Sequence, residues 1–423
     1  MINGKKALLI LGGAAQLCDI IEDAKRMGYY TVVTDYLEDS PGKRIADETA
    51  MVSIVDVDGL VDLCRKRNID GIMNYCLDPG QKPYFRVCKE LGWKCYGTEE
   101  QFNIMSNKDM FKKECAKYGI STIPGYDAEG DVTDEVIERV KYPVVVKPAD
   151  GRASKGSSLC HNKEELLAGI KTALDYSDRK KVVIEKYLTG LQEVVIKYCI
   201  VEGEVFFTSM SDLYTCYTKD GTRAYIGSQT FPSRYVDMYL DKVDARVKSM
   251  IKGMGIQNGA MSWDGFVDGD DIRFFDPSFR MGGAQDWRIV DRICGVNIST
   301  LLTNFAMTGS MGDVEKIRKV DKAFVNKSSA MLYFLSGLGH IDRIVGLEES
   351  EKCDSVIGYH LSHEEGDDVT QFGTSDHVVI RFLMVADTKE KLKEDILKIQ
   401  SVFDVLDKDG NSMLLPNFDI DVF

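Results

Sequence analysis

The sequence has no apolar run of about 18 residues, so no segment is long enough to cross a membrane as a helix. Its first apolar run, residues 7–11, is too short for the core of a signal peptide. The 11 cysteines include no CxxC pair and are odd in number. In a chain of this length that pattern is typical of free thiols in a reducing compartment. We therefore expect a soluble, cytoplasmic protein.

Positive charge is also scarce. The 423 residues include 53 Lys and Arg against 67 Asp and Glu, which gives a formal net charge of −14. Nonspecific binding to nucleic acids or anionic lipids depends on clustered Lys and Arg. We therefore expect neither a nucleic-acid nor a membrane partner. The 44% of hydrophobic residues is ordinary for a globular protein, and the length suggests about three domains.

The first hundred residues alternate short apolar runs with helical patterns. Residues 7–11 and 31–34 read as buried strands, and the apolar residues of 17–24 follow helical spacing. Strands that alternate with helices predict a parallel sheet with right-handed crossovers. Further along, hairpins begin at about residue 140, and the last hundred residues mix strands with a charged helix. The predicted fold class therefore combines α/β and α+β.

The N-terminal part holds only a fragment of a dinucleotide motif, and no GxxxxGK[ST] loop occurs in the chain. Gly12 and Gly13 follow the first predicted strand, and Asp35 ends the second. The GxGxxG spacing is absent, because Ala15 and Gln16 stand where further glycines would be needed. We favour a nucleotide-fold domain without a bound nucleotide, with a nicotinamide-dependent oxidoreductase as an alternative.

Two segments in the middle of the chain suggest a nucleotide site of another kind. A buried strand ends at Lys147, whose ammonium group needs an anion, and the loop 150–158 has small residues whose N–H groups can close on phosphate oxygens. The segment 185–188 can present backbone groups to an adenine edge, and Glu193 could accept hydrogen bonds from a ribose. The alternatives are a flexible hairpin tip and a solvated hinge.

A pair of carboxylates gives the strongest signal. The turn sequence at residues 268–270 predicts a hairpin that brings Asp264 and Asp276 side by side. Two unpaired carboxylates there would repel each other, and a divalent cation with a preference for hard oxygen ligands, Mg²⁺, removes that cost. Ser278 and Arg280 follow on the same face of the strand, where Arg280 can meet a transferring phosphoryl group.

The order of these patterns resembles the ATP-grasp superfamily over roughly residues 1–310. The resemblance implies a nucleotide-fold-like domain, an ATP-grasp module of two subdomains and a small C-terminal lid. The implied boundaries are 1–100 for the first domain, 101–190 for the subdomain with the phosphate flap, 191–320 for the metal and catalytic subdomain, and 321–423 for the lid.

The resemblance also implies roles for single residues. Those implied to bind ATP are Lys108, Lys147, Ser154, Gly156, Ser157, Glu185, Lys186, Leu188 and Glu193. Those implied to bind one or two Mg²⁺ ions are Asp264, Asp276 and Ser278, and Arg280 is similar to the catalytic arginine of the E-x-N-x-R motif. The family usually has Glu, Glu and Asn at the three metal positions, so both carboxylates are one methylene shorter here.

ATP-grasp enzymes generally activate a carboxylate as an acyl phosphate, which an amine then attacks. The implied activity is an ATP-dependent carboxylate–amine ligase that joins an amino acid to another small molecule and releases ADP and phosphate. Gly282 and Gly283 resemble the corresponding segment of amino-acid ligases. Arg381 lies on a predicted strand and is a candidate clamp for a substrate carboxylate, with a structural salt bridge as the alternative.

Two further alternatives stay open. One is another ATP-grasp reaction that uses formate or bicarbonate, of the purine-pathway or carboxylase type. The other is an ATP-binding sensor without catalysis, which the shortened metal ligands motivate. A homodimer is expected only because dimers are the commonest assembly.

Overall fold

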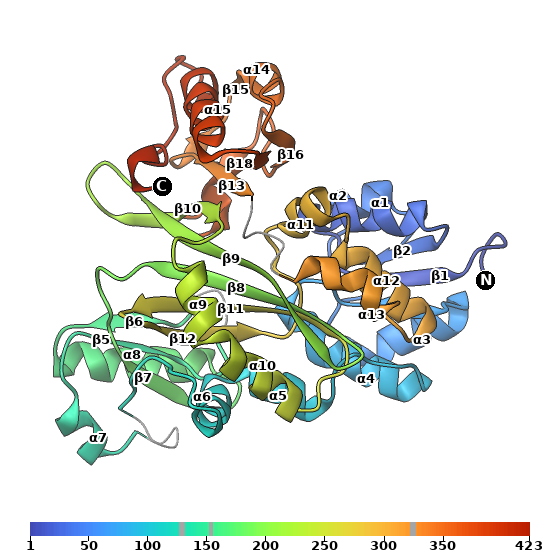
Figure 1. The fold of residues 1–423 in the computed structure, drawn as a ribbon, viewed down its shortest axis with the longest axis horizontal. Helices are drawn as coiled ribbons and strands as arrows, with labels where there is room; N and C mark the ends of the chain where they lie inside the picture. The colour runs from blue at the N-terminus through green and yellow to red at the C-terminus, as the bar shows by residue number, and fades with distance from the viewer. Residues whose placement is uncertain (127–131, 152–154, 322–326) are drawn as a thin grey trace.

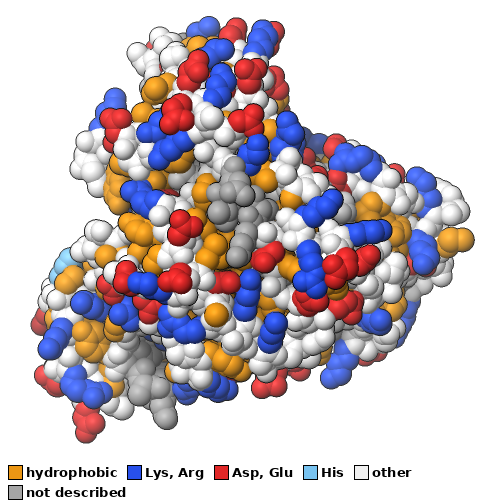
Figure 2. Space-filling model, in the orientation of Figure 1, with side chains coloured by type: hydrophobic (Ala, Val, Ile, Leu, Met, Phe, Trp, Pro, Cys, Tyr) orange, Lys and Arg blue, Asp and Glu red, His pale blue; other side chains and the backbone are white. Residues whose placement is uncertain are grey.

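The computed structural model describes residues 1–126, 132–151, 155–321 and 327–423. Figure 1 shows the N-terminal domain, the middle of the chain and the last hundred residues as three lobes around one large sheet. Within the described residues, no helix is both long and apolar enough to cross a bilayer. On the face drawn in Figure 2, acidic and basic side chains are interspersed.

The N-terminal domain is built on a parallel sheet of four strands in the order β3-β2-β1-β4, which confirms the predicted topology. Its central strand β1 (Ala7–Leu11) is buried along its whole length, as the apolar run predicts. The other strands are β2 (Tyr30–Thr34), β3 (Glu48–Ala50) and β4 (Gly71–Met73). The helices are α1 (Cys18–Arg26), α2 (Pro41–Ile45), α3 (Val57–Arg67) and α4 (Gln81–Leu91).

Packing fills the space beside the glycine pair of this domain. The Gly42 N–H donates to the Gly13 carbonyl at 2.7 Å, and a Cβ on Gly13 would lie 2.0 Å from the Ser40 hydroxyl oxygen. The Asp35 carboxylate accepts hydrogen bonds from the N–H groups of Gly13 and Leu37. A ribose would have to displace these bonds, so the geometry disfavours the nicotinamide alternative.

The middle of the chain begins with a small antiparallel sheet in the order β6-β5-β7, against which helix α8 packs. Its strands are β5 (Val144–Pro148), β6 (Ser158–Cys160) and β7 (Val182–Lys186). The helices here are α5 (Glu99–Ser106), α6 (Lys108–Lys117), α7 (Asp134–Arg139) and α8 (Lys163–Tyr176).

The large sheet has eight antiparallel strands in the order β12-β11-β8-β9-β10-β13-β18-β16. Five come from the middle of the chain: β8 (Glu193–Val201), β9 (Glu204–Tyr217), β10 (Arg223–Phe231), β11 (Gly259–Asp268) and β12 (Asp271–Ser278). Three come from the last hundred residues: β13 (Ser328–Leu335), β16 (Val356–Leu361) and β18 (Val378–Ala386). Because β10 pairs with β13, one continuous sheet joins the third and fourth predicted units.

The remaining elements surround this sheet. The helices are α9 (Val236–Lys242), α10 (Asp244–Gly253), α11 (Trp287–Cys294), α12 (Ile298–Thr308), α13 (Val314–Ile317), α14 (Leu347–Glu351) and α15 (Lys389–Val402). The short strands are β14 (Gly339–His340), β15 (Arg343–Val345), β17 (Asp368–Val369) and β19 (Asp404–Leu406).

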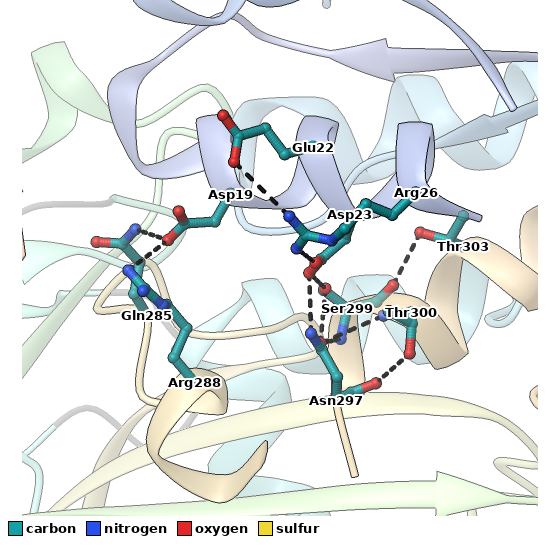
Figure 3. Close-up of polar contacts among 10 residues, drawn as sticks. All are labelled: Asp19, Glu22, Asp23, Arg26, Gln285, Arg288, Asn297, Ser299, Thr300 and Thr303. Carbon is teal, nitrogen blue, oxygen red and sulfur yellow. Dashed lines mark hydrogen bonds and ion pairs between the residues drawn. The ribbon is translucent and has the colours of Figure 1, made fainter. Parts of the chain in front are cut away.

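A polar network attaches the N-terminal domain to helices α11 and α12, as Figure 3 shows. Its centre is Asp23 on α1, which is 6% exposed and accepts hydrogen bonds from the Ser299 hydroxyl at 2.8 Å and the Asn297 amide at 2.9 Å. Arg26 pairs with the same carboxylate. The network fixes α1 against the segment that follows strand β12.

We expect Asp23→Ala to lower the free energy of unfolding by about 1–3 kcal/mol, because it leaves the half-buried Asn297 amide without this acceptor and removes the nearest anionic partner of Arg26. Urea unfolding measures the change. Glu22→Ala is the matched control, since Glu22 is 55% exposed and lies 3.9 Å from Arg26; it should cost less than about 0.5 kcal/mol. Equal losses in the two variants would contradict the role of the network.

Candidate active site

The hairpin of β11 and β12 places Asp264 directly opposite Asp276, which confirms the predicted pairing. Residues opposite each other in an antiparallel pair project from the same face. Burial raises the pKa of Asp264 well above its usual value, and the charges of Asp276 and Glu193 raise it further. The protein by itself therefore disfavours the ionised form of Asp264 beside Asp276.

A row of polar side chains continues from this pair across the large sheet. Ser278 lies opposite Ser262, which lies opposite Lys197 on β8, and Glu193 on β8 lies opposite Phe266. Together with the two aspartates, these residues line a cavity of about 1940 Å³. A cavity of this size exceeds the range of about 300–1,000 Å³ common for single small ligands, so it has room for more than one.

Two buried lysines stand behind the wall of the cavity. The Lys108 ammonium group lies 3.2 Å from the Asp276 carboxylate and donates to the Gly151 carbonyl at 2.8 Å. Lys147 lies over the ring of Phe275, with its nitrogen 5.5 Å from the ring centre. Burial lowers the pKa of Lys147, although the nearby Glu185 opposes that shift. The two lysines thus bring positive charge to the edge of the acidic site.

Glu185 is buried, and two lysines form ion pairs with its carboxylate. Its carboxylate lies 2.5 Å from the ammonium groups of both Lys112 and Lys147. Burial opposes ionisation of Glu185, but the two positive charges outweigh it and lower its pKa to about 2. Sequence analysis missed Lys112. The available signal was its position four residues after Lys108, which puts both on one face of α6.

The residues predicted to contact adenine and those predicted to form the flap do not all line the cavity. Leu188 lines the cavity, while the Lys186 N–H donates to the Pro124 carbonyl at 2.9 Å. Gly156 adopts a φ of 73°, and a Cβ there would lie 2.7 Å from Tyr176, so glycine is required. In the described part of the chain, the lining includes neither Gly156 nor Ser157. Ser154 lies outside the described residues.

Arg280 follows β12 and pairs with the N-terminal domain. Its guanidinium group donates to both oxygens of Asp78, at 2.5 and 2.9 Å, and to the Met281 carbonyl at 2.8 Å. Burial would lower the pKa of Arg280, but the charge of Asp78 outweighs it and raises that pKa. Sequence analysis missed Asp78, although a carboxylate shortly after the end of a parallel strand is a common position for site residues.

The two glycines after Arg280 differ in their surroundings. A Cβ on Gly282 would lie 2.9 Å from the Lys197 ammonium nitrogen, whereas one on Gly283 would meet nothing within 4 Å. Lys197 is buried and pairs with Asp286. Gly282 therefore leaves room for Lys197, whereas a side chain at position 283 would have free space.

Arg381 on β18 also lines the cavity and is 8% exposed. Its guanidinium group donates to the Gln285 side-chain oxygen at 2.5 Å and lies 5.4 Å from the ring centre of Tyr333. Both of these contacts of Arg381 are with uncharged groups, so neither is the structural salt bridge that was the alternative for this residue. Sequence analysis missed Gln285.

Two carboxylates and a hydroxyl, from Asp264, Asp276 and Ser278, are the donors that the hairpin offers to a cation. No group of three or more His, Cys, Asp or Glu side chains suited to a metal occurs among the residues described. The donor set still fits Mg²⁺, because its ligands are hard oxygens and a divalent cation would favour the ionised form of Asp264, which burial and the charges of Asp276 and Glu193 disfavour. Phosphate oxygens and waters commonly supply the remaining ligands of Mg²⁺.

Part of the chain is similar in sequence to known proteins. Residues 107–202 match the family model described as the ATP-binding domain of the carbamoyl-phosphate synthase L chain. The chain is also 24% identical over 200 residues to the formate-dependent phosphoribosylglycinamide formyltransferase of Sulfurisphaera tokodaii, a match that covers 46% of this chain and 50% of that protein. The chain thus spans about half the length of this relative.

Solved structures extend the likeness to nearly the whole chain. The L-amino acid ligase of Bacillus licheniformis superposes with a TM-score of 0.76 at 17% identity, over 95% of this chain and 98% of that one. The biotin carboxylase domain of 2-oxoglutarate carboxylase from Hydrogenobacter thermophilus, solved with MgADP and bicarbonate, superposes with a TM-score of 0.74 at 18% identity, over 95% and 90%. At these identities the likeness establishes the fold. Residues 107–202 thus resemble this ATP-binding domain, and nearly the whole chain shares the fold of these two structures.

Proposed function

We propose that the protein is an ATP-dependent carboxylate–amine ligase that works through an acyl phosphate and releases ADP and phosphate. The observation that carries the proposal is the opposed pair of Asp264 and Asp276 in the wall of one large cavity, with Lys108 in ion-pair contact with Asp276. Opposed carboxylates next to phosphate-binding cations suit a site for a metal nucleotide.

In this proposal Lys108 and Lys147 hold the phosphates of ATP, and Glu185 with Lys112 fixes the position of Lys147. Leu188 and Lys186 present backbone groups to the adenine, and Glu193 accepts from the ribose. Gly156 and Ser157, with Ser154, belong to a flap over the phosphates. Such a flap excludes water and protects an acyl phosphate from hydrolysis.

Asp264, Asp276 and Ser278 would hold Mg²⁺, which neutralises phosphate charge when bound. A substrate carboxylate oxygen attacks the γ-phosphorus of ATP, the bond to the β–γ bridging oxygen breaks, and ADP leaves. Arg280 compensates the negative charge that develops on the transferred group. The amine nitrogen then attacks the acyl carbon, phosphate leaves with the former carboxylate oxygen, and the amine loses a proton.

The part of the cavity that does not hold the phosphates determines which acid and which amine react. Gly282 next to Lys197, and the fold shared with an L-amino acid ligase, favour an amino acid as one substrate. The formyltransferase and carboxylase among the similar proteins support formate or bicarbonate as the second candidate. A screen of paired amino acids for ADP and phosphate release separates the two, because ADP formation only with formate or bicarbonate contradicts the amino-acid proposal.

We expect Asp276→Asn to reduce ADP formation by at least about 100-fold, since it removes one charge from the metal-binding pair. Steady-state turnover measures the loss. Asp270→Asn is the matched control, because Asp270 is 80% exposed in the turn of the same hairpin; its turnover should equal that of the wild type. Near-normal turnover of Asp276→Asn would remove the basis of the metal assignment.

Arg280→Ala should lower kcat by about 100-fold or more while changing the Kd for ATP by about threefold or less, because its charge matters mainly in the transition state. Turnover and nucleotide titration provide the two numbers. Asp78→Asn should give a smaller loss in kcat, since it only loosens the orientation of the guanidinium group. Equal losses in turnover and ATP affinity for Arg280→Ala would argue against a catalytic role.

Gly282→Ala should impair turnover more than Gly283→Ala, because only the first added methyl group displaces Lys197. A matched pair of neighbouring glycines makes the comparison sensitive to the site and insensitive to general stability. Turnover at saturating ATP measures it. A larger effect of Gly283→Ala would show that the approach of Lys197 to residue 282 is unimportant.

A further inference from the structure

Arg381 differs from two other cations that line the cavity, Lys197 and Arg280. Lys197 pairs with Asp286 and Arg280 with Asp78, so each has its charge compensated by a carboxylate. In the described structure, Arg381 has instead a neutral amide as its closest partner, and its buried Nε–H has no acceptor at all. A buried guanidinium group without a counter-ion is unfavourable unless a ligand supplies the anion.

The surroundings of Arg381 limit that anion to a single charge. His360, Arg381 and Tyr333 lie opposite one another on three neighbouring strands and all line the cavity. Burial, together with the charges of Arg381 and Arg288, lowers the pKa of His360 to about 4, so its ring is neutral at pH 7. Arg288 itself pairs with Asp19. One guanidinium group matches one carboxylate in a two-point contact, whereas a phosphate dianion calls for more positive charge.

The amide of Gln285 is held in one orientation. Its nitrogen donates to the Asp19 carboxylate at 2.7 Å, and its oxygen accepts from Arg381 at 2.5 Å. Figure 3 shows Gln285 and Arg288 both directed at Asp19 on helix α1. Because a carboxylate only accepts and a guanidinium group only donates, the reversed amide would lose both hydrogen bonds. Asp19 therefore fixes which end of the amide faces Arg381.

The backbone at this position is also unusual. Gln285 is 2% exposed and has a φ of 62°, in the left-handed region that residues with side chains rarely adopt. Strained conformations of this kind persist where the surrounding structure enforces them, and they cluster at functional sites. The strain here directs a buried amide between Asp19 of the first domain and Arg381 of the large sheet.

We propose that Gln285 is the positioning residue of a carboxylate subsite: its neutral amide orients Arg381 without neutralising it, which leaves the guanidinium group to bind a substrate carboxylate that is not activated. This inference rests on the proposed function and names one substrate class, a small acid whose bound carboxylate is distinct from the one phosphorylated. A glutamate at position 285 could still accept from the guanidinium group, but it would take up its charge and would face the Asp19 carboxylate without a donor.

Binding measurements test the subsite without turnover. The wild type, saturated with Mg²⁺ and the non-hydrolysable analogue AMP-PNP, is titrated calorimetrically with each of the twenty common L-amino acids. Each amino acid that binds is compared with its carboxamide, and inorganic phosphate and glycerol 3-phosphate serve as dianionic probes. The variants are Gln285→Glu, Gln285→Met and Arg381→Gln, with Gln257→Glu, an exposed residue outside the site, as the matched control for added charge.

We expect at least one amino acid to bind the wild type about 10- to 100-fold more tightly than its carboxamide. This preference for the acid should disappear in Gln285→Glu and Arg381→Gln, weaken in Gln285→Met and persist in Gln257→Glu. The Kd for AMP-PNP should stay within about twofold of the wild type in all of them, which also reports that each variant is folded. A purely structural role of Gln285 would weaken acid and carboxamide alike.

Three results would overturn the inference: no amino acid binds the wild type, the dianionic probes bind in preference to the acids, or Gln285→Glu keeps the preference for the acid. The outcome is separable from that of the proposed function. A wild type that prefers acids but forms no ADP with any acid–amine pair refutes the ligase proposal alone. A wild type that forms ADP but binds acid and carboxamide equally refutes the subsite alone.

Discussion

The repulsion between two carboxylates on one hairpin is the constraint around which the site is arranged. Asp264 and Asp276 face each other from paired strands, and burial of Asp264 together with the charge of Asp276 raises the pKa of Asp264 well above its usual value. Among the residues described, Lys108 is the one cation in ion-pair contact with either of them. The acidic pair and the lysines behind it thus lie next to each other, and the proposed site for a metal nucleotide rests on this arrangement.

A short segment after β12 connects this chemistry to the other two lobes. Arg280 is held by Asp78 of the N-terminal domain, and Gln285 bridges Asp19 of the same domain to Arg381 of the C-terminal strands. Helix α12 then continues the attachment through the network around Asp23 (Figure 3). The arginine proposed to be catalytic and the arginine proposed to bind substrate are therefore both connected to the N-terminal domain through residues 280–285.

Sequence patterns were sufficient where a structural feature depends on residues close together in the chain. The apolar run of β1 predicted a buried central strand, and the turn at 268–270 set the pairing of Asp264 with Asp276, because hairpin register follows from turn position. The partners of Arg280 and Glu185 escaped prediction. Asp78 is 202 residues from Arg280 in the chain, and no periodicity relates such positions.

The sequence alone determined the fold class, the succession of strands and helices, and the presence of an acidic pair among conspicuous lysines and arginines. Only the tertiary structure decided which of these charges are compensated within the protein. Glu185 is enclosed by two lysines, whereas Arg381 meets a neutral amide. The physical reason is that electrostatic compensation depends on distance and burial, and both are set by contacts between segments far apart in the chain.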